Sequence, residues 1–533
     1  MDVDCLSFKK TGYFSSLICD YVEQKEGLKP FYNRFPLLGN FEGQLEEKTL
    51  SFPDSNREIL YDALQKQYGH TKTSKKTLDH IRQLKEPITF TVTTGHQLNL
   101  FTGPLYFLYK IISAINLSKA LKKEYPKYNF VPVYWMATED HDFEEINYFN
   151  FKGRKIQWNK KTKGAVGHLS TDTLKEVYDA FSNALGTTTN ANRLKDLFTS
   201  SYLENKTLTE ATRFLANELF SEYGLVIVDG DDRELKKLLV PYARRDIFEN
   251  LSFHKVSESA SALKSLSDSY NIQVNPREIN YFYLNKGLRE RIIEKGGRYF
   301  VNDTKIEFSK EQLLFELENN PERFSPNVIT RPLYQEVILP NLCYIGGGGE
   351  IAYWLELKNM FETMGVTFPM LLLRNSVLML TEKQGEKLQR MNLSVADLFL
   401  KQNNLINKKI REISNVDIDF SPQKLHLEEQ FKMLYKLAEQ TDASFLGAVK
   451  AQEIKQKKGL DHLEKRLLKA QKRKLKDQVT RMTTLQNELF PGKSLQERNQ
   501  NFSEFYLEMG SALIPALINV LDPLKQEFGI VKF

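Results

Sequence analysis

The sequence has few cysteines and no long apolar run, and both scarcities limit the class of protein it can encode. Its three cysteines, Cys5, Cys19 and Cys343, are too few and too scattered for a disulfide framework or a paired-cysteine metal site. No uncharged apolar stretch approaches the roughly 20 residues of a membrane span. The first residues, MDVDCLSFKK, lack a basic segment followed by an apolar one, so no secretory signal is expected. We therefore predict a cytoplasmic protein without a membrane segment.

Positive charge is concentrated in one segment of the chain. The 533 residues carry a net charge of +6. Between Lys450 and Lys476 there are 11 Lys or Arg and three acids, a balance of +8 that leaves the other residues at −2. This segment is typical of a solvated helical face, because it lacks the aromatic side chains that stack on bases and an apolar face for membrane insertion. Nucleic-acid binding is therefore not expected.

The first 380 residues alternate between strand-like and helix-like segments. The β-rich ITFTVTT, the helix-like PLYFLYKIISAINLSKALKKEY and the apolar FVPVYWMAT follow one another, an order that predicts a parallel βαβ unit. We expect further strands in YGLVIVD, YQEVILPNLCYI and FPMLLLRNSV, with the helix EIAYWLELKNMF between the last two. Hairpins are expected in FNFKGRKIQW and at Asn302-Asp303. These segments predict an α/β fold with a parallel sheet.

A different pattern begins after Thr381. Leu468, Leu475, Met482 and Leu489 recur at seven-residue spacing, which predicts a short seam in an antiparallel helical hairpin or a dimeric coiled coil. We expect a catalytic core over 1–380 with inserted segments at about 151–220 and 255–325. A helical coiled-coil domain over 381–505 and a segment over 506–533 that packs back on the core complete the expected organisation.

Polar clusters stand at the ends of several predicted strands, where open parallel sheets bind their ligands. The clusters are Gly95-His96-Gln97, Glu139-Asp140-His141-Asp142, Asp229 with Asp231, and the run Gly346, Gly347, Gly348 and Gly349. A histidine before a helix can bind a phosphate, and the alternative for His96 is a loop histidine that caps backbone groups. The acidic cluster could bind a divalent metal, an amine or ribose hydroxyls, or simply begin a helix.

The glycine run fits a backbone that a ligand approaches closely, with Glu350 and Tyr353 facing the same ligand. It is not a P-loop, because no GK[ST] follows, and Ile351 stands where a dinucleotide fingerprint requires its third glycine. The alternative is a tight turn between strand and helix. Arg331 and Arg374 flank predicted strands, and arginine favours carboxylate or phosphate partners.

The chain resembles the bacillithiol-synthesis family BshC, in which a cysteine is added to glucosaminyl-malate. The matching segments are TTGHQLNLFTGPLYFLYKI, VPVYWMATEDHDFEEI, GLVIVDGDD, SPNVITRPLYQEVILPNLCYIGGGGEIAYWLELK and P-x-LLLRNS, in this order. The resemblance implies a Rossmann-like core similar to nucleotidylyltransferases and class I aminoacyl-tRNA synthetases, and a coiled coil that mediates homodimerisation. The related superfamily has an HxGH motif where this chain has TTGHQ, so the first histidine is absent, and no KMSKS-type motif is evident.

The resemblance implies a ligase that joins cysteine to glucosaminyl-malate. We hypothesise that ATP, with Mg²⁺ as a possible metal, activates the carboxylate of cysteine and that the glucosamine amine then attacks it. We assign catalysis to His96, Gln97, Glu139, Asp140, His141 and Asp142. Substrate contacts are assigned to Asn99, Arg331, Tyr344, Glu350, Tyr353 and Arg374, and nucleotide contacts to Gly95, the glycine run, Asp229 and Asp231. The alternatives are another nucleotidylyltransferase-like enzyme that activates an amino acid, and a non-catalytic coiled-coil scaffold or RNA-binding protein.

Overall fold

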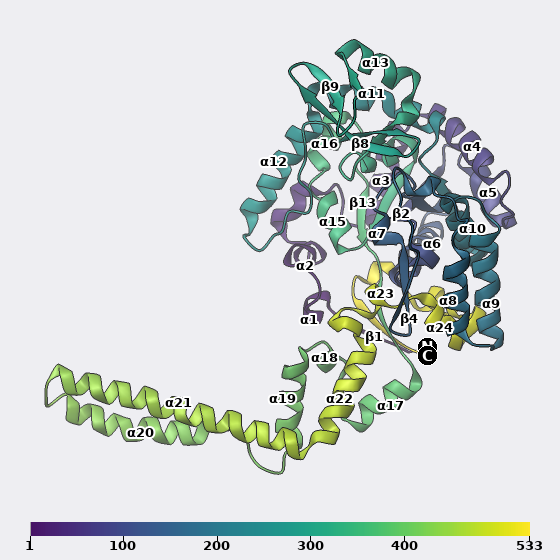
Figure 1. The fold of residues 1–533 in the computed structure, drawn as a ribbon. Helices are drawn as coiled ribbons and strands as arrows, with labels where there is room; N and C mark the ends of the chain where they lie inside the picture. Colours follow the sequence, from purple (N-terminus) through teal and green to yellow (C-terminus); the bar gives the residue numbers. More distant parts are fainter. Residues whose placement is uncertain (1) are drawn as a thin grey trace. The chain divides into compact units, whose positions relative to one another are not determined.

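The structure is a computed structural model that describes residues 2–533 (Figure 1). Its contacts divide the chain into two compact units, Met1–Met379 with Ser494–Val531, and Leu380–Lys493 with Lys532–Phe533. The sequence placed the later boundary at 506 rather than 494. Residues after Ser494 join the first unit because the buried side chains of Gln496 and Glu497 accept hydrogen bonds from backbone N–H groups of strand β14 (Ser376–Leu380).

A five-stranded parallel sheet forms the centre of the first unit, as the sequence predicted. Its strands are β2 (Thr89–His96), β3 (Asn129–Met136), β6 (Val226–Asp229), β12 (Asn341–Gly346) and β13 (Met370–Leu373). They lie in the order β13-β12-β2-β3-β6, and every neighbouring pair is parallel. Along the chain, β3 and β6 are added in order on one side of β2, and β12 and β13 are then added on its other side. Such a reversal opens a crevice beyond the carboxyl ends of the two strands.

Both faces of the sheet are covered, which explains why its strands are nearly continuous runs of buried residues. On one face, Phe90 and Val92 join a cluster with residues of α3 (Phe41–Ser51) and α6 (Tyr106–Glu124). On the other face, Thr91 and Thr93 donate hydrogen bonds to the side-chain oxygen of Asn341, at 3.2 and 2.9 Å. Threonine suits this position because its β-branched side chain favours a strand and its hydroxyl can donate to the buried Asn341.

The prediction of a strand across YQEVILPNLCYI is wrong in its first half. Helix α14 covers Arg331–Ile338, and only Asn341–Gly346 forms the strand. The helix begins with a proline in its first turn, and its buried pairs Leu333 with Val337 and Tyr334 with Ile338 are spaced four residues apart. This spacing sets an apolar stripe against the sheet, which outweighs the local strand preference of Val337 and Ile338.

The single helix predicted over EIAYWLELKNMF is divided in two. Helix α15 covers Gly348–Trp354 and helix α16 covers Lys358–Met364. Leu355 and Leu357, at the junction, are fully buried. The buried Glu356 between them accepts the backbone N–H of Gln273 at 2.8 Å.

The inserted segments contain the predicted hairpins. Strands β4 (Tyr148–Phe151) and β5 (Arg154–Gln157) pair antiparallel. A second antiparallel sheet has the order β10-β9-β8-β7-β11, and Asp303, at φ 56°, lies in the turn between β9 and β10. Its strands are β7 (Tyr281–Asn285), β8 (Leu288–Lys295), β9 (Arg298–Val301), β10 (Glu307–Phe308) and β11 (Phe324–Pro326).

The end of the first unit packs back on its core, as predicted. Asn116 of α6 donates hydrogen bonds to the carbonyl oxygens of Ile518 and Leu521, at 2.9 and 2.6 Å. Strand β15 (Phe528–Lys532) lies between β1 (Asp2–Leu6) and β14 in a three-stranded sheet. Within residues 2–533, no helix is both long enough and apolar enough to cross a bilayer.

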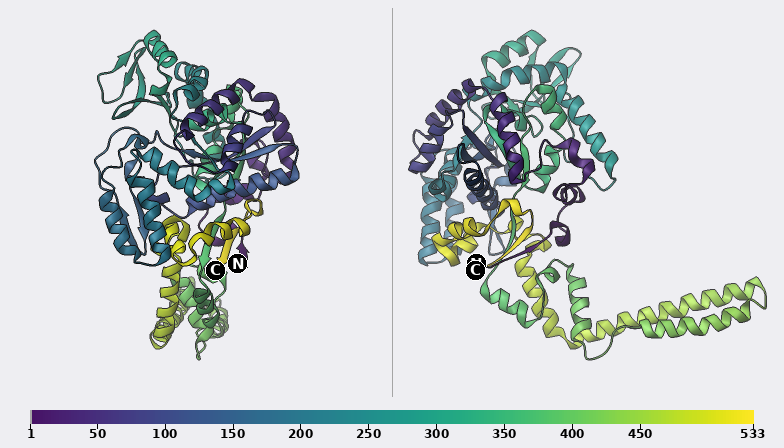
Figure 2. Two further views of the ribbon diagram at one scale, coloured as in Figure 1. Left: turned by 90° about the vertical axis from the view of Figure 1, so that its right-hand side faces the viewer. Right: turned by 180° about the vertical axis from the view of Figure 1, so that it is seen from behind.

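Helices surround these sheets (Figure 2). Before β2 lie α1 (Phe8–Thr11), α2 (Ser16–Val22), α3, α4 (Asp54–Tyr68) and α5 (Lys75–Gln83). Between β3 and β11 lie α7 (Phe143–Ile146), α8 (Lys175–Leu185), α9 (Thr189–Phe198), α10 (Leu208–Phe220), α11 (Arg233–Glu249), α12 (Leu251–Leu266) and α13 (Lys310–Asn319). After Ser494 lie α23 (Gln496–Asn499), α24 (Phe502–Met509) and α25 (Leu513–Val520).

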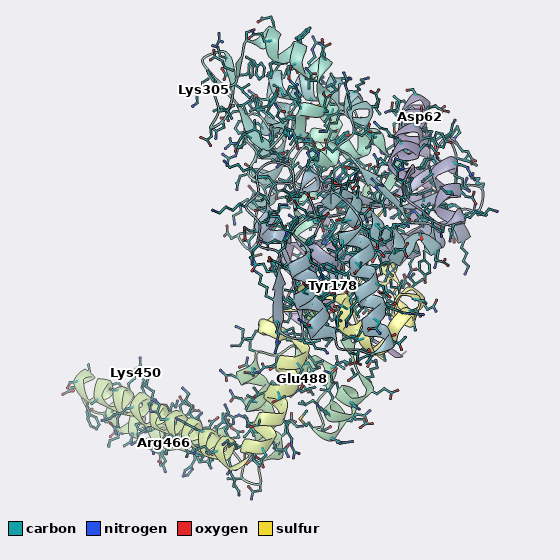
Figure 3. The ribbon with its side chains drawn as sticks, turned by 45° about the vertical axis from the view of Figure 1, so that its right-hand side comes forward. Asp62, Tyr178, Lys305, Lys450, Arg466 and Glu488 are labelled. Atoms are coloured by element: carbon teal, nitrogen blue, oxygen red, sulfur yellow. The ribbon has the colours of Figure 1, made fainter. Side chains whose placement is uncertain are left out.

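The second unit is helical, as predicted. It contains α17 (Glu382–Arg390), α18 (Val395–Leu398), α19 (Gln402–Ile413), α20 (Ser421–Ala438), α21 (Ala443–Lys474) and α22 (Lys476–Leu489). Helices α20 and α21 lie side by side as a hairpin (Figure 1), and Figure 3 labels Lys450 and Arg466 on the basic helix α21.

The seven-residue seam is used inside this unit. Leu475 separates α21 from α22, and together with Leu468 it packs on Ile406 and Ile410 of α19. Farther along the seam, Met482 and Leu489 are buried. The seam therefore contacts a neighbouring helix of the same chain.

Candidate active site

His96 is the last residue of β2, at the crevice where the strand order reverses. Its side chain is buried, and its ring contacts the rings of Tyr106 and Phe107 with centroids 5.4 and 5.1 Å away. Burial, and then the positive charges of Lys110 and Arg374, lower the pKa of His96 well below its usual range. The ring is therefore neutral near pH 7. Its Nε2 atom has no hydrogen-bond partner among the described residues, so it is available to a ligand.

A strained turn directly after β2 holds this histidine. Phe101 and Thr102 have φ values of 47° and 68°, a region that non-glycine residues rarely occupy, and Gly103 follows at 62°. The backbone of Thr102 hydrogen-bonds the ring of His96. The turn is fixed from outside, because Asn501 donates to the carbonyl oxygens of Phe101 and Gly103, both at 2.7 Å.

Replacing Gly103 with alanine is expected to destabilise the protein by about 1–3 kcal/mol more than the same change at Gly186. Both glycines have positive φ, but a Cβ at Gly103 would lie 2.6 Å from the Cβ of Asn99, whereas one at Gly186 would meet nothing within 4 Å. The comparison removes the backbone cost and isolates the clash. Urea denaturation of both variants measures it, and equal midpoints would show that the turn yields freely.

Lys110 of α6 joins the strand end to the glycine run. Its Nζ donates to the carbonyl oxygen of Gly95 at 2.6 Å and lies 2.5 Å from Oε2 of Glu350. Glu350 also accepts the hydroxyl of Tyr344 and the backbone N–H of Gly347, at 2.7 and 2.8 Å. Burial would raise the pKa of Glu350, but Lys110 and these donors lower it, so the carboxylate stays charged. Glu350 therefore organises this pocket.

The four glycines of the run differ in how closely other atoms approach the position where a Cβ would lie. A Cβ at Gly346 would lie 2.9 Å from the Cβ of Glu350, so close packing inside the protein already requires glycine there. A Cβ at Gly347 would have Oε2 of Glu350 and Nε of Arg374 as its nearest atoms, at 3.5 and 3.6 Å. A Cβ at Gly348 would first meet Ile18, at 3.5 Å, and one at Gly349 only Gln273, at 4.0 Å. Beyond Gly346, a Cβ would therefore make only ordinary van der Waals contacts, so close packing does not require glycine there.

The two predicted arginines, Arg331 and Arg374, differ in how many of their side-chain nitrogens already have hydrogen-bond partners. Both terminal nitrogens of Arg374 are occupied, by Glu497 at 2.8 Å and by the residues that follow it, and only its buried Nε lacks a partner among the described residues. Arg331 lies over the rings of Trp135 and Tyr344 and reaches the hydroxyl of Tyr353 at 3.4 Å. Arg331 is thus the better placed of the two to bind a carboxylate of a ligand.

The acidic cluster after β3 is tied to the histidine strand by Gln97. The Nε2 atom of Gln97 donates to Asp140 at 2.8 Å and to Glu145 at 3.0 Å. Asn99 donates to the carbonyl oxygen of Glu145 at 3.3 Å. Asp142 is exposed at the start of α7 and makes no capping hydrogen bond.

His141 is exposed and receives Arg289 from the inserted sheet. The Nη1 atom of Arg289 lies 2.6 Å from Nδ1 of His141. The guanidinium also packs over Phe282 and donates to the hydroxyl of Ser325 at 3.2 Å. The insertion thus adds a cation beside the acidic cluster.

A buried lysine joins the second and third strand ends. Nζ of Lys236 lies 2.5 Å from Glu139 and 3.0 Å from Asp231, and the lysine side chain is 1% exposed. Burial raises the pKa of Glu139 to about 7 although Lys236 opposes the shift. Burial would also raise the pKa of Asp231, but Lys236 and His168 lower it to about 2. Asp229 accepts the hydroxyl of Thr138 and the backbone N–H of Asp231.

The register of the sheet places these groups along one edge. His96, Met136 and Asp229 are opposite one another on β2, β3 and β6. With strands spaced by about 4.8 Å, the backbones of His96 and Asp229 are roughly 10 Å apart. The edge therefore combines the buried groups around His96 and Lys110 with a carboxylate-rich half beyond β3.

Within residues 2–533 no group of three His, Cys, Asp or Glu side chains is arranged to hold a metal ion. Lys236 and Arg289 instead supply positive charge to the acidic cluster, and Gln97 donates a hydrogen bond to Asp140.

Four residues of this edge were absent from the sequence-based assignment: Lys110, His168, Lys236 and Arg289. Lys236 precedes the exposed Lys237, and the two lysines are indistinguishable in sequence. The only signal was the position of Lys110 inside the apolar stripe of its helix, where a charged residue requires a buried partner.

Comparisons with known proteins agree with this architecture. A family model described as the N-terminal Rossmann-like domain of bacillithiol biosynthesis BshC matches residues 1–375, and one described as the C-terminal coiled-coil domain of BshC matches residues 377–533. A relative from Flavobacterium johnsoniae, named "Putative cysteine ligase BshC", is 60% identical over all of both chains. Relatives with the same name are 58% identical in Christiangramia forsetii, over 100% of this chain and 99% of the other, and 36% identical in Cytophaga hutchinsonii, over 98% and 97%. The chain therefore belongs to the BshC family of bacillithiol biosynthesis.

Proposed function

We propose that this protein is a ligase that joins the carboxyl group of L-cysteine to the amine of glucosaminyl-malate, the last step of bacillithiol formation. The observation that carries the proposal is the edge of the parallel sheet, where a neutral histidine with an unpartnered Nε2 lies about 10 Å from a carboxylate-rich half. The relatives' shared name points to the same chemistry. The three cysteines are free thiols, in keeping with a cytoplasmic enzyme.

We propose that a nucleoside triphosphate such as ATP binds at the strand reversal. The buried Nε2 of His96 and Nε of Arg374 lack partners among the described residues, and a Cβ at Gly347 would lie 3.6 Å from that Nε. When bound, the nucleotide supplies the activation that amide formation from a free acid and an amine requires in water. In this proposal the bound phosphate favours protonation of His96, so that Nε2 donates to the phosphate and stabilises its charge, and any Mg²⁺ enters with the nucleotide.

The carboxylates of the malate group require cationic side chains that are not already paired with a carboxylate of the protein. Arg331 holds only a long hydrogen bond to Tyr353 and one to Gln335, at 3.4 and 3.1 Å. We assign it to one carboxylate, because arginine binds carboxylates through paired donors. Arg374 contributes a single donor and mainly holds Glu497 in place.

The test is a reaction with purified protein, L-cysteine, glucosaminyl-malate and ATP, read by thiol labelling and mass spectrometry. Bacillithiol should form only when all three compounds are present. Cysteine-dependent ATP–pyrophosphate exchange without bacillithiol would favour another amino-acid-activating enzyme. Tight binding of a structured RNA without either reaction would favour the scaffold. In cells that lack the gene, glucosaminyl-malate should accumulate.

We also propose that the helical hairpin binds a second copy of the chain. Helix α20 exposes Met433 and Leu437 one turn apart, with 69% and 52% of their surface accessible, and α21 exposes Ile454 and Leu463. The seven-residue seam is already used within the chain, so these outer residues are the surface left for a partner helix.

Replacing both Met433 and Leu437 with glutamate is expected to convert the homodimer to a monomer. Losing two apolar side chains from an interface weakens association by about 3–6 kcal/mol. Light scattering during size-exclusion chromatography should show the mass fall from twice to once 62.0 kDa. The exposed Lys450, replaced by glutamate, is the control and should stay dimeric. A wild-type monomer at every concentration would contradict the proposal.

A further inference from the structure

His168 lies at the same sheet edge, although it comes from the inserted segment after β5. It ends the short 3-10 helix Val166–His168. The backbone N–H groups of Val166 and Gly167 donate to the carbonyl oxygens of Asp140 and Thr138, at 2.7 and 2.9 Å. The insertion is therefore bonded directly to the segment that follows β3.

The close approach of this loop requires glycine at position 167. A Cβ there would lie 2.5 Å from the hydroxyl of Thr209 and 2.8 Å from the Cβ of Thr138. Because no other residue fits without displacing these groups, Gly167 fixes the position of the following histidine.

Asp231 orients the imidazole. Its Oδ2 lies 2.7 Å from Nε2 of His168, and its Oδ1 lies 3.0 Å from Nζ of Lys236. Both carboxylate oxygens are therefore engaged, so Asp231 cannot itself accept a proton readily. The ring keeps its Nδ1 atom without a hydrogen bond among the described residues, and its side chain is 58% exposed.

Three other candidate bases at this edge are occupied, whereas Asp142 is exposed at the start of α7. Glu139 is held by Lys236, and Asp140 accepts from Gln97 and from the backbone N–H of His141. The His141 ring accepts a hydrogen bond from Arg289 at Nδ1, so its proton is on Nε2 and that nitrogen can only donate. Nδ1 of His168 is the exposed basic nitrogen on this half of the edge, whereas the unpartnered Nε2 of His96 is buried.

We propose that His168, oriented by Asp231, is the general base that removes the proton from the attacking amine. The inference rests on the proposed function, since it names a residue for that reaction. As the amine nitrogen bonds to the activated carbonyl carbon, its proton passes to Nδ1 of His168. The bond from that carbon to the leaving oxygen breaks and its electron pair stays on the oxygen. The imidazolium then returns its proton to water.

The electrostatic surroundings suit this role. Asp231, Asp229 and Glu139 face the histidine, with Lys236 as the buried cation among them. The hydrogen bond from Asp231 raises the pKa of His168 above its ordinary value, against the opposing effect of burial. A raised pKa makes the deprotonated imidazole a stronger base toward the proton of the amine.

The test compares His168→Gln with wild type in bacillithiol formation from cysteine, ATP and glucosaminyl-malate. We expect kcat to fall by about 10²–10⁴-fold with little change in KM for cysteine. The acidic limb of the pH profile, where the base becomes protonated, should disappear. Hydroxylamine, an amine largely neutral at pH 7, should give cysteine hydroxamate at equal rates with both proteins, because it needs no base. His254→Gln, at an exposed histidine on α12, is the matched control.

Gly167→Ala provides a second variant that retains the imidazole. It should displace the loop and lose the same acidic limb, while a cooperative urea transition, at a midpoint lowered by the clash, shows that the fold persists. A His168→Gln protein with wild-type kcat and an intact acidic limb would overturn the role of His168 alone. A wild-type protein that forms no bacillithiol would overturn the proposed function, and this inference with it.

Discussion

Replacing His96 with asparagine is expected to lower kcat for bacillithiol formation by about 10²–10³-fold, the usual cost of losing one group that stabilises transition-state charge. The imidazole is buried and neutral without a ligand, and its Nε2 has no hydrogen-bond partner among the described residues. Steady-state rates with saturating cysteine and ATP measure the loss. The fold should survive, because the ring is packed mainly against Tyr106 and Phe107.

The control for this change is His70→Asn, at an exposed histidine between α4 and α5. It should leave both kcat and the urea midpoint unchanged. Cysteine-dependent pyrophosphate exchange separates the two histidines of the edge, since it should be lost in His96→Asn and retained in His168→Gln. Equal bacillithiol formation by His96→Asn and His70→Asn would remove His96 from the reaction.

Replacing Lys236 with methionine is expected to destabilise the protein by about 3–5 kcal/mol, the cost of leaving buried charges without their partner. The loss should be larger at pH 8 than at pH 5. Without the lysine, the folded-state pKa of Glu139 rises further above that of the unfolded chain, and it is already about 7. Stability is therefore present at low pH and is lost as pH rises through that pKa. Urea midpoints at the two pH values measure the difference.

Lys237→Met is the matched control, because Lys237 is 46% exposed and pairs only with Glu234. Its effect should be at most about 0.5 kcal/mol at either pH. Adding Glu139→Gln to Lys236→Met should recover part of the loss at pH 8, since one uncompensated carboxylate is removed. Identical midpoints for the two lysine variants would show that the cluster does not depend on Lys236.

The sheet and its polar edge were predictable because they follow from local patterns. Apolar runs that end in polar clusters gave His96, Glu139 and the glycine run, and the structure places all three at the carboxyl ends of neighbouring strands. The strand predicted over residues 334–340 failed because Val337 and Ile338 favour strands locally. Their four-residue spacing from Leu333 and Tyr334 becomes informative only when the sheet they cover is known.

The polar partners of the edge could not be predicted in the same way. Lys236 and Lys237 are adjacent, yet one is buried against two carboxylates and the other is paired at the surface. His168 reaches Asp231 across 63 residues, through an insertion whose path depends on Gly167. Such contacts are set by long-range packing, which single-sequence periodicity does not contain.

The clamp on the turn after β2 has a consequence for how the enzyme is made. Asn501, which fixes the carbonyl oxygens of Phe101 and Gly103, is separated from Phe101 by 400 residues. During synthesis on the ribosome, the parallel sheet can assemble once β13 has emerged, but the turn that holds His96 is completed only after residue 501 follows. A nascent chain or a fragment that stops before α23 thus carries the histidine on an unclamped turn. Activity should therefore appear late in translation, and truncated products should compete poorly for substrates.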